Sequence, residues 1–502
     1  MRRFINLLTN RLTIIGLILL LQIGILWWFV YEFAATWYYL HLVSMILGVI
    51  LSLYIITTDE NPMFKLMWVV FMIVLPVFGV LFYLYAKTER LSISSSSTMR
   101  RMQKVRENEM RKIKSVFDPK YLKQQKYLTN LNFPSFKNTS SIFLGSGEEK
   151  QTELLRELKK AKHFIFMEYF IITISKMWDE ILQVLIEKQK QGVEIRIMYD
   201  DFGSATKLPF YYHKKLTKMG IKVVRFNPMK LHVNFAMNFR DHRKIVVIDN
   251  RVAFTGGFNI GDEYTNKKKV FGHWNDAGIM IEGEAVWSMT MLFLENWSFS
   301  KKDDTTDFSK YNIKYPPIIN DAIYIPFGDI TVDNNLTAKN IYLHLINDAQ
   351  QTIYITAPYL ILDNEIATAL KLAAQSGVDV HIIMPSIPDK RFVYMVSKSY
   401  AEELVHSGVK IYRYKPGFIH SKMIICDKEA AMIGSSNLDF RSLYMHLENN
   451  LWLNDIKTIS NMVNYYEYTL KESERITIKD FTKRNIIYRV VQAVLKGFSP
   501  LL

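Results

Sequence analysis

HRKIVVID at positions 242–249 and HSKMIICD at positions 420–427 are two copies of one short motif. A glycine and an asparagine follow each copy at the same interval, so both read H-x-K-x4-D-x6-G-x2-N. The apolar run between the lysine and the aspartate is typical of a buried strand. The histidine and the lysine lie two residues apart, and they point to the same face because side chains alternate along a strand. The motif therefore predicts two equivalent strands, each presenting a His–Lys pair.

The sequence around the two motifs is also duplicated. Helix-like stretches alternate with apolar strands at residues 150–228 in the first half and 353–416 in the second. Strands that alternate with helices predict a mostly parallel sheet with helical cover. We therefore expect an α/β fold built from two repeats, residues 137–305 and 306–502, with two packed, mostly parallel sheets.

The first 90 residues are strongly apolar. Three uncharged segments, residues 12–31, 33–57 and 66–85, are each long enough to cross a hydrocarbon core of about 30 Å. We therefore expect transmembrane helices within residues 1–90. The basic residues Arg2, Arg3 and Arg11 and a basic cluster after residue 86 indicate that both ends are cytoplasmic, which three full spans cannot satisfy. The number of spans, two or three, stays open: the third segment could be re-entrant, and the first could be a cleaved signal.

A serine-rich and basic stretch, residues 91–136, joins this region to the repeats. It could be a solvated linker helix or a basic collar on anionic headgroups, worth about 1 kcal/mol per charge near the surface. The formal net charge of +15 suits nucleic acid or an anionic membrane, and the apolar segments favour the membrane. The single cysteine, Cys426, excludes an intramolecular disulfide and is expected to be a buried, unreactive thiol.

Two more segments have open interpretations. Residues 229–241 form an insert that the second half lacks, with apolar residues between basic ones. This insert could dip into a bilayer, line an acyl-chain groove or be an ordinary packed loop. Residues 484–502 place apolar residues at helical spacing, as in a helix that docks on its own domain or lies on a membrane surface.

The motif residues match the needs of phosphodiester cleavage without a metal ion. Such a reaction requires a nucleophile, a proton donor for the leaving alkoxide, and positive charge around the phosphoryl oxygens. One of His242 and His420 can form a covalent phosphohistidine, while the other protonates the leaving oxygen and then deprotonates the acceptor. Lys244 and Lys422 supply fixed charge.

Four further motif residues have supporting roles. Asn259 and Asn437 are expected to donate amide hydrogen bonds to the same phosphoryl oxygens. Asp249 and Asp427 complete the two catalytic motifs, but they lie at the far ends of the strands, where we expect a structural role. No carboxylate cluster with metal-ligand spacing accompanies the motifs, so the sequence predicts no metal and no other cofactor.

A histidine nucleophile also needs an acid on its second ring nitrogen, which sets its tautomer and basicity. Asp276 and Glu448 follow the motif histidines of their own halves by 34 and 28 residues. We therefore expect Asp276 to orient His242 and Glu448 to orient His420.

The double motif resembles that of the phospholipase D superfamily, and the chain as a whole resembles bacterial cardiolipin synthases. The similarity covers nearly the whole chain and includes LPVFG at 75–79, NFRDHRK at 238–244, FTGGFNIGDEY at 254–264 and GSSNLDFRS at 434–442. The chain departs from the family in HWND at 273–276, where the family more often has arginine before the acid.

The resemblance implies that two phosphatidylglycerol molecules become cardiolipin and glycerol by reversible phosphatidyl transfer. It implies that His242 is the nucleophile and His420 the general acid–base. It also implies a multi-pass protein of the bacterial cell membrane with a cytoplasmic catalytic domain. Its partners would be phosphatidylglycerol and the anionic bilayer, not nucleic acid.

Other functions stay open at this point. A membrane phospholipase D, or another phosphatidyltransferase that uses water or a different alcohol, would carry the same motifs. A membrane-tethered nuclease would fit the net charge. A non-enzymatic lipid-binding protein would fit the membrane region, although both motifs are complete. The sequence does not indicate the oligomeric state.

Overall fold

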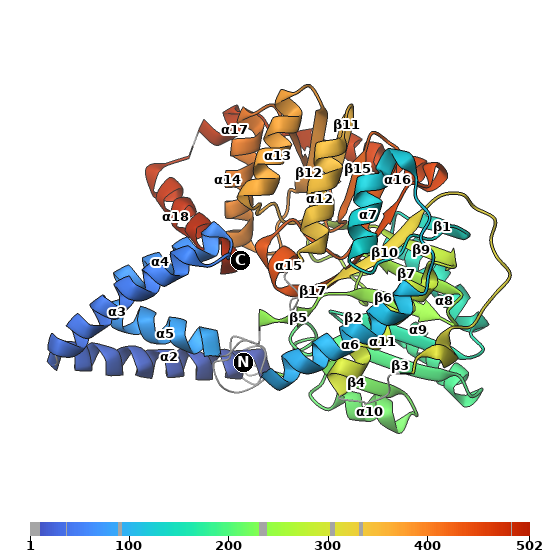
Figure 1. Cartoon of the computed structure of the whole chain (residues 1–502), viewed down its shortest axis with the longest axis horizontal. Helices are drawn as coiled ribbons and strands as arrows, with labels where there is room; N and C mark the ends of the chain where they lie inside the picture. The colour runs from blue at the N-terminus through green and yellow to red at the C-terminus, as the bar shows by residue number, and fades with distance from the viewer. Residues whose placement is uncertain are drawn as a thin grey trace.

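The structure, a computed structural model, describes residues 11–36, 38–88, 93–229, 238–301, 307–330, 335–482 and 484–501. It consists of an α/β body with a group of N-terminal helices that extends from one side of it (Figure 1). Most of the insert at residues 229–241 lies outside the described residues, as do Arg2 and Arg3 of the predicted topology signal.

The first half of the body contains a seven-stranded sheet in the order β1-β9-β7-β6-β2-β3-β4. Its strands are β1 (Thr139–Leu144), β2 (Phe164–Tyr169), β3 (Glu194–Asp200), β4 (Lys222–Phe226), β6 (Lys244–Ile248), β7 (Val252–Gly256) and β9 (Gly278–Gly283). Its connecting helices are α8 (Gly147–Lys160), α9 (Lys176–Lys190) and α10 (Tyr212–Lys218).

The second half repeats this topology in the order β10-β17-β16-β15-β11-β12-β13, with β18 added at the edge. Its strands are β10 (Tyr324–Asp329), β11 (Thr352–Thr356), β12 (Asp379–Pro385), β13 (Lys410–Tyr414), β15 (Met423–Cys426), β16 (Ala430–Gly434), β17 (His446–Leu453) and β18 (Ser473–Arg475). Its connecting helices are α12 (Thr337–Asp348), α13 (Asn364–Gln375) and α14 (Arg391–His406). The predicted duplication is confirmed.

The prediction of mostly parallel sheets is wrong, because both sheets are mixed. The parallel pairs of the two sheets lie within β2-β3-β4 and β11-β12-β13. Helical crossovers connect these strands, and such a crossover is what makes two neighbours parallel. Each motif strand is instead joined to the next strand by a tight turn, which makes the pairs β6–β7 and β15–β16 antiparallel.

The motif aspartates form these tight turns. Asp249 and Asn250 have φ values of 55° and 53°, and Asp427 and Lys428 have φ values of 50° and 58°. Two consecutive left-handed residues are the mark of a type I′ hairpin turn. Asp and Asn adopt this conformation at a lower cost than most residues, which explains an aspartate at the end of each motif.

One hydrophobic core extends through both halves. Helix α11 (Val286–Lys301) is buried along its length from Val286 to Ser298 and contacts both β6 of its own half and β10 of the second half. Helix α16 (Ile456–Lys471) contacts β15 of its own half and β1 of the first half. A helix that is buried all round belongs in a core, so α11 joins the two repeats.

The predicted linker contains a helix that packs on the body. Helix α6 (Ile93–Arg111) lies against α11 and buries Met99, Met102 and Met110. Arg106 is also buried, with its Nε 2.6 Å from a carboxylate oxygen of Glu295 on α11. The interpretation of this stretch as a solvated linker is therefore wrong for α6. Short elements that follow it are η1 (Pro119–Tyr121) and α7 (Leu122–Asn130).

The N-terminal region forms helices α2 (Arg11–Thr36), α3 (Tyr38–Thr57), α4 (Pro62–Val74) and α5 (Pro76–Thr88). The third predicted segment is divided between α4 and α5, because Pro76 has no N–H to continue the helix and instead starts a new one. Helices α3, α4 and α5 pack against one another. Among the described residues, no helix combines the length and the apolar character that crossing a membrane requires.

The C-terminal part contains α15 (Phe440–Tyr444), α17 (Lys479–Thr482), α18 (Ile486–Gly497) and η4 (Ser499–Leu501). The predicted C-terminal helix is thus confirmed as α18. Figure 1 shows α18 beside α4, at the junction of the body and the N-terminal helices.

Candidate active site

Two short strand pairs cross from one half of the body to the other beside the motif histidines. β5 (Arg240–Asp241) ends at His242 and pairs in parallel with β17 of the second half. β14 (Gly417–Ile419) ends at His420 and pairs in parallel with β8 (His273–Asn275) of the first half. The two histidine N–H groups donate to the carbonyl oxygens of Leu447 and Asn275, at 2.9 Å and 2.6 Å. Each motif histidine is therefore held by the backbone of the opposite half.

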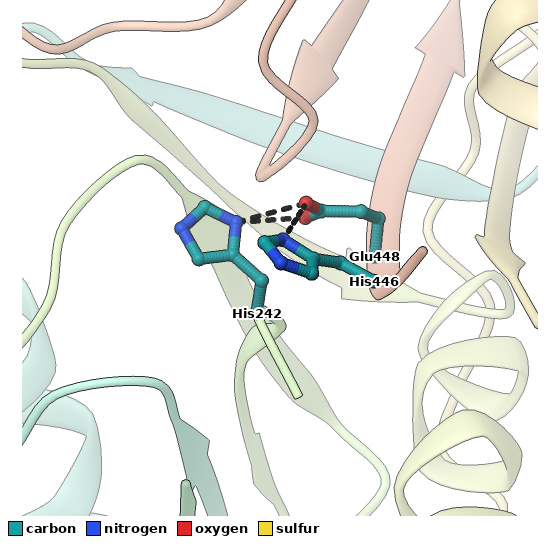
Figure 2. Close-up of side chains that lie close together, drawn as sticks. All are labelled: His242, His446 and Glu448. Carbon is teal, nitrogen blue, oxygen red and sulfur yellow. Dashed lines mark hydrogen bonds and ion pairs between the residues drawn. The ribbon is translucent and has the colours of Figure 1, made fainter. Parts of the chain in front are cut away.

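Each motif histidine also contacts a carboxylate that comes from the opposite half of the body. Nδ1 of His242 lies 2.9 Å and 3.1 Å from the two carboxylate oxygens of Glu448 (Figure 2). Nδ1 of His420 lies 2.6 Å from Oδ2 of Asp276. The predicted assignment, in which Asp276 orients His242 and Glu448 orients His420, is therefore wrong. Its physical cause is the strand crossing, since Glu448 lies on β17 and Asp276 follows β8.

Both carboxylates are held in place by further hydrogen bonds. Ser435 and Ser442 each donate from Oγ to Glu448. Asp276 accepts from the N–H of Ala277 at 2.8 Å. A carboxylate fixed beside Nδ1 favours the tautomer in which Nδ1 carries the proton. Each imidazole is then left with an unprotonated Nε2 for chemistry.

A ring lies against each motif histidine, two residues before the orienting acid. The ring of His446 is 5.6 Å from that of His242, and the ring of Trp274 is 5.2 Å from that of His420, measured between centroids. Phe170 also meets His242 edge to face at 4.9 Å. None of these three residues was predicted from the sequence. His446 lies two residues before Glu448 on the same strand. Strand alternation places both side chains on one face, and this signal could have indicated His446.

The motif lysines are buried beside the histidines of their own copies. Their Nζ atoms donate to the carbonyl oxygens of His242 and His420. Burial lowers the pKa of Lys244 to about 7 and that of Lys422 to about 8, although nearby carboxylates oppose this effect. A buried cation whose pKa is lowered in this way is stabilised when an anion binds beside it.

The same burial and the lysine charges act on the imidazoles. They lower the pKa of His242 well below its ordinary value and that of His420 to about 4. The pKa of His242 is lowered further by His420 and Lys422, which places the two motifs in one site. Burial would raise the pKa of Asp276, but His420 and Lys422 keep it below its ordinary value. At neutral pH both imidazoles are therefore uncharged, and Asp276 is ionised.

Asp249 and Asp427 lie at the other ends of the motif strands. Each carboxylate accepts hydrogen bonds from three consecutive backbone N–H groups: Lys162, His163 and Phe164 for the first, and Gln350, Gln351 and Thr352 for the second. These groups lead into β2 and β11. The two aspartates thus fix the start of the strand next to each motif strand.

The two motif asparagines are buried close to the motif strands. Oδ1 of Asn259 accepts from the N–H of Ile171 at 3.0 Å, and its Nδ2 donates to the hydroxyl of Tyr264 at 2.9 Å. Asn437 is held through its backbone N–H, which donates to Oγ of Ser442 at 2.8 Å. The predicted contact of these amides with phosphoryl oxygens stays a prediction.

His242, His446 and Glu448 form a group that could hold a metal ion, with side-chain ligand atoms within 4.8 Å of one another. Two imidazoles and a carboxylate are a ligand set that Zn²⁺ accepts. The Glu448 oxygens, however, already accept hydrogen bonds from His242, Ser435 and Ser442. A metal ion would have to displace these bonds, so the arrangement suits the orientation of His242 better than metal binding.

One buried centre thus combines two imidazoles, two lysines and a carboxylate behind each imidazole. One imidazole can attack a phosphodiester while the other transfers protons to and from the departing and arriving oxygens. The lysines can balance the charge of the phosphoryl oxygens. The fold and the site together suit an enzyme that acts on phosphodiesters.

Comparison with known proteins identifies the family. Residues 154–286 and 342–470 match the family model described as cardiolipin synthase, PLD-like domain. Residues 46–87 match the model described as phospholipase D-nuclease N-terminal. A cardiolipin synthase of Halalkalibacterium halodurans is 33% identical over 98% of this chain and 100% of its own length. Cardiolipin synthase 2 of Bacillus cereus is 40% identical over 72% of this chain and 71% of its own length. The chain belongs to the cardiolipin synthase family with phospholipase D-like domains.

A solved structure shares the fold. The phosphatidylserine synthase of Haemophilus influenzae superposes with a TM-score of 0.57 at 17% identity, covering 76% of this chain and 97% of that chain. At this low identity the likeness shows the duplicated α/β architecture alone.

Proposed function

We propose that this protein is a phosphatidyltransferase that makes cardiolipin from two molecules of phosphatidylglycerol and releases glycerol. The observation that carries the proposal is the pair of buried His–Lys motifs with exchanged carboxylates, found in a chain of the cardiolipin synthase family. The paired site can form and resolve a covalent intermediate, which is what phosphatidyl transfer to an alcohol requires.

The reaction has two steps of the same chemical type. The first forms a bond between phosphorus and histidine, and the second breaks it. In the first, Nε2 of His242 attacks phosphorus, a P–N bond forms and the P–O bond to glycerol breaks, while His420 protonates the departing oxygen. In the second, His420 takes a proton from a hydroxyl of the next phosphatidylglycerol, whose oxygen attacks phosphorus and breaks the P–N bond. A bound phosphodiester anion raises the low pKa of His420, which allows this imidazole to carry the proton.

The assignment of His242 as the nucleophile follows the family resemblance, since the geometry around the two histidines is nearly symmetric. Lys244 and Lys422 would hold the phosphoryl oxygens, with Asn259 and Asn437 as further amide donors. Each imidazolium that forms in the cycle would be stabilised by the carboxylate on its Nδ1.

We also propose that α2–α5 bind the lipid bilayer. Large apolar side chains are exposed on each of these helices, among them Leu20, Leu53, Ile73 and Leu81. Large apolar side chains exposed in such number are typical of lipid or protein contact. The family match at residues 46–87 supports this role.

Cysteine accessibility in intact cells and in inverted vesicles tests the topology of this membrane region. Cys426 is buried, so a cysteine introduced in place of Lys104 on the exposed face of α6 can be labelled with little background. We expect a membrane-impermeant maleimide to label this position in inverted vesicles but not in intact cells. Labelling from outside intact cells would contradict a cytoplasmic catalytic domain.

Product analysis by mass spectrometry tests the reaction. Purified protein and a His242→Ala control would be given phosphatidylglycerol vesicles in excess EDTA. We expect cardiolipin and equimolar glycerol from the native chain and neither from the control. Phosphatidic acid alone would mean that water is the acceptor and that the protein is a phospholipase D. Activity that needs added divalent ions would overturn the metal-free mechanism.

A further inference from the structure

Helix α18 is amphipathic, but its apolar face is exposed and its polar face contacts the body. Ile487, Val490, Val491 and Val494 follow the i, i+3, i+4, i+7 spacing of one helix face. This face is turned away from the body, with 71%, 56%, 40% and 55% of these side chains exposed. Ile486 lies beside them and is 72% exposed.

The opposite face of α18 is held to the body by polar contacts. Gln492 is buried and donates from Nε2 to the carbonyl oxygen of Met395 at 2.6 Å. Lys496 lies 3.1 Å from Glu403, and Arg484, just before the helix, lies 2.9 Å from Glu402. These partners are on α14. The polar side therefore anchors the helix, and the apolar side is left to meet a different environment.

Helix α18 lies next to an N-terminal helix that also exposes apolar side chains. α18 contacts α4, and Figure 1 shows the two side by side. Leu66, Val70 and Ile73 of α4 are exposed at helical spacing as well. Arg489 is exposed next to the α18 stripe, where a cation can meet the phosphates of lipid headgroups.

We propose that α18 is a second lipid-binding element, with its apolar stripe inserted into the interface of an anionic bilayer. This proposal rests on the proposed binding of α2–α5 to the bilayer, which places α18 at the membrane surface. A helix that lies in the interface with its apolar side among the acyl chains and a cation at its edge has the chemistry found here. Burial of apolar area in lipid also removes the cost of exposing this stripe to water.

This second contact would set the position of the active site over the membrane. The start of α4 is tied to α15, because Nδ2 of Asn61 donates to the hydroxyl of Tyr444 at 2.9 Å. α15 lies between Asn437 and Glu448 in the chain. With α18 on the bilayer beside α4, a helix anchored to α14 of the body contacts lipid directly, so the position of the body does not depend on the N-terminal helices alone.

The test uses the full-length protein in vesicles that contain phosphatidylglycerol. Single cysteines would replace Val490 and Val494, with the buried Cys426 replaced by alanine, and would carry an environment-sensitive fluorophore. A matched control position is Tyr468, which is 66% exposed on α16, a helix that Figure 1 shows on the opposite side of the body from α18. We expect blue-shifted emission and quenching by brominated lipids at both α18 positions, and neither at Tyr468.

Emission at the α18 positions equal to that at Tyr468 would overturn the proposal. So would a blue shift that brominated lipids do not quench, since this would mean that protein covers the stripe. A probe at Leu53 on α3 separates the two proposals. Quenching at Leu53 but not on α18 would refute only the role of α18, whereas quenching on α18 but not at Leu53 would refute only the role of the N-terminal helices.

Discussion

Each motif histidine depends on a carboxylate that is distant in the sequence and adjacent in space. Glu448 accepts from Nδ1 of His242 and is itself held by Ser435 and Ser442. Asp276 holds His420 with a single short bond of 2.6 Å. Because these carboxylates choose the tautomer and balance the imidazolium, they act on the rate although they need not touch the lipid.

Replacement of Glu448 by glutamine should lower kcat by about 10²–10⁴-fold, because a neutral amide can neither select the Nδ1–H tautomer nor balance the imidazolium. Initial rates of cardiolipin formation in mixed micelles measure the effect. Glu467→Gln, which changes an exposed carboxylate paired with Lys428, is the matched control and should keep the native rate. A rate within twofold of native for Glu448→Gln would show that the carboxylate does not assist His242.

The pH dependence of kcat/KM should reflect the two lysines of the empty enzyme. The pKa of Lys244 is lowered to about 7 and that of Lys422 to about 8. A lysine is uncharged above its pKa, so kcat/KM should fall as the pH rises through 7 and 8. The nucleophile His242 must be unprotonated, and its pKa well below the ordinary value keeps it so over this range. His420 must take up a proton before it can act as the acid, and its low pKa adds to the same fall with rising pH. Rates from pH 5.5 to 9.5 check this, and a flat profile to pH 9.5 would show that the lysines stay charged. Lys422→Arg, which cannot lose its charge, should remove the fall near pH 8 and keep the fall near pH 7 that comes from Lys244.

Among the helices, α6 shows how a polar segment can belong to the core. Its sequence is serine-rich and basic, yet three methionines and Arg106 are buried on a helix that packs against α11. The guanidinium of Arg106 lies over the ring of Phe133 at 4.4 Å and donates to Asn132 and Glu295. Its exposed face keeps Arg100, Arg101 and Lys104, so a basic collar on anionic lipid remains a prediction for that face.

Replacement of Arg106 by methionine should destabilise the body by about 3–5 kcal/mol, because it breaks the buried ion pair between Arg106 and Glu295. The unfolding temperature in detergent measures the effect. Arg111→Met on the same helix removes an exposed pair with Glu107 and should change stability by less than about 1 kcal/mol. Equal unfolding temperatures for the two variants would contradict the buried pair.

The molecule as a whole is a duplicated unit whose halves exchange the parts that complete the site. β5 pairs with β17, β14 pairs with β8, and each orienting acid serves the histidine of the other half. The exchange makes the two repeats mutually dependent, since neither half alone contains an oriented motif histidine.

A trapping experiment tests this exchange. In a His420→Ala background, a phosphatidyl donor with a p-nitrophenol leaving group needs no general acid, and a burst of p-nitrophenol reports the phosphorylation of His242. Adding Glu448→Gln should slow the burst by about 10²-fold or more, because the carboxylate acts on His242. Adding Asp276→Asn should have a far smaller effect, because its partner is already absent. The reverse pattern would contradict the exchanged pairing. A burst that persists in His242→Ala with native His420 would contradict the choice of His242 as the nucleophile.

Much of this protein could be read from its sequence. The motif at residues 242–249 and 420–427 predicted the duplicated α/β fold, the motif histidines and lysines, and the resemblance to cardiolipin synthases. These features depend on strand alternation and on local spacing, which are properties of the sequence itself. Three things were decided only by the tertiary structure. The sheets are mixed because tight turns follow the motif strands, α6 is packed because α11 offers it a partner, and the acids are exchanged because β5 and β14 pair across the halves. Each depends on contacts between segments far apart in sequence, which spacing alone cannot reveal.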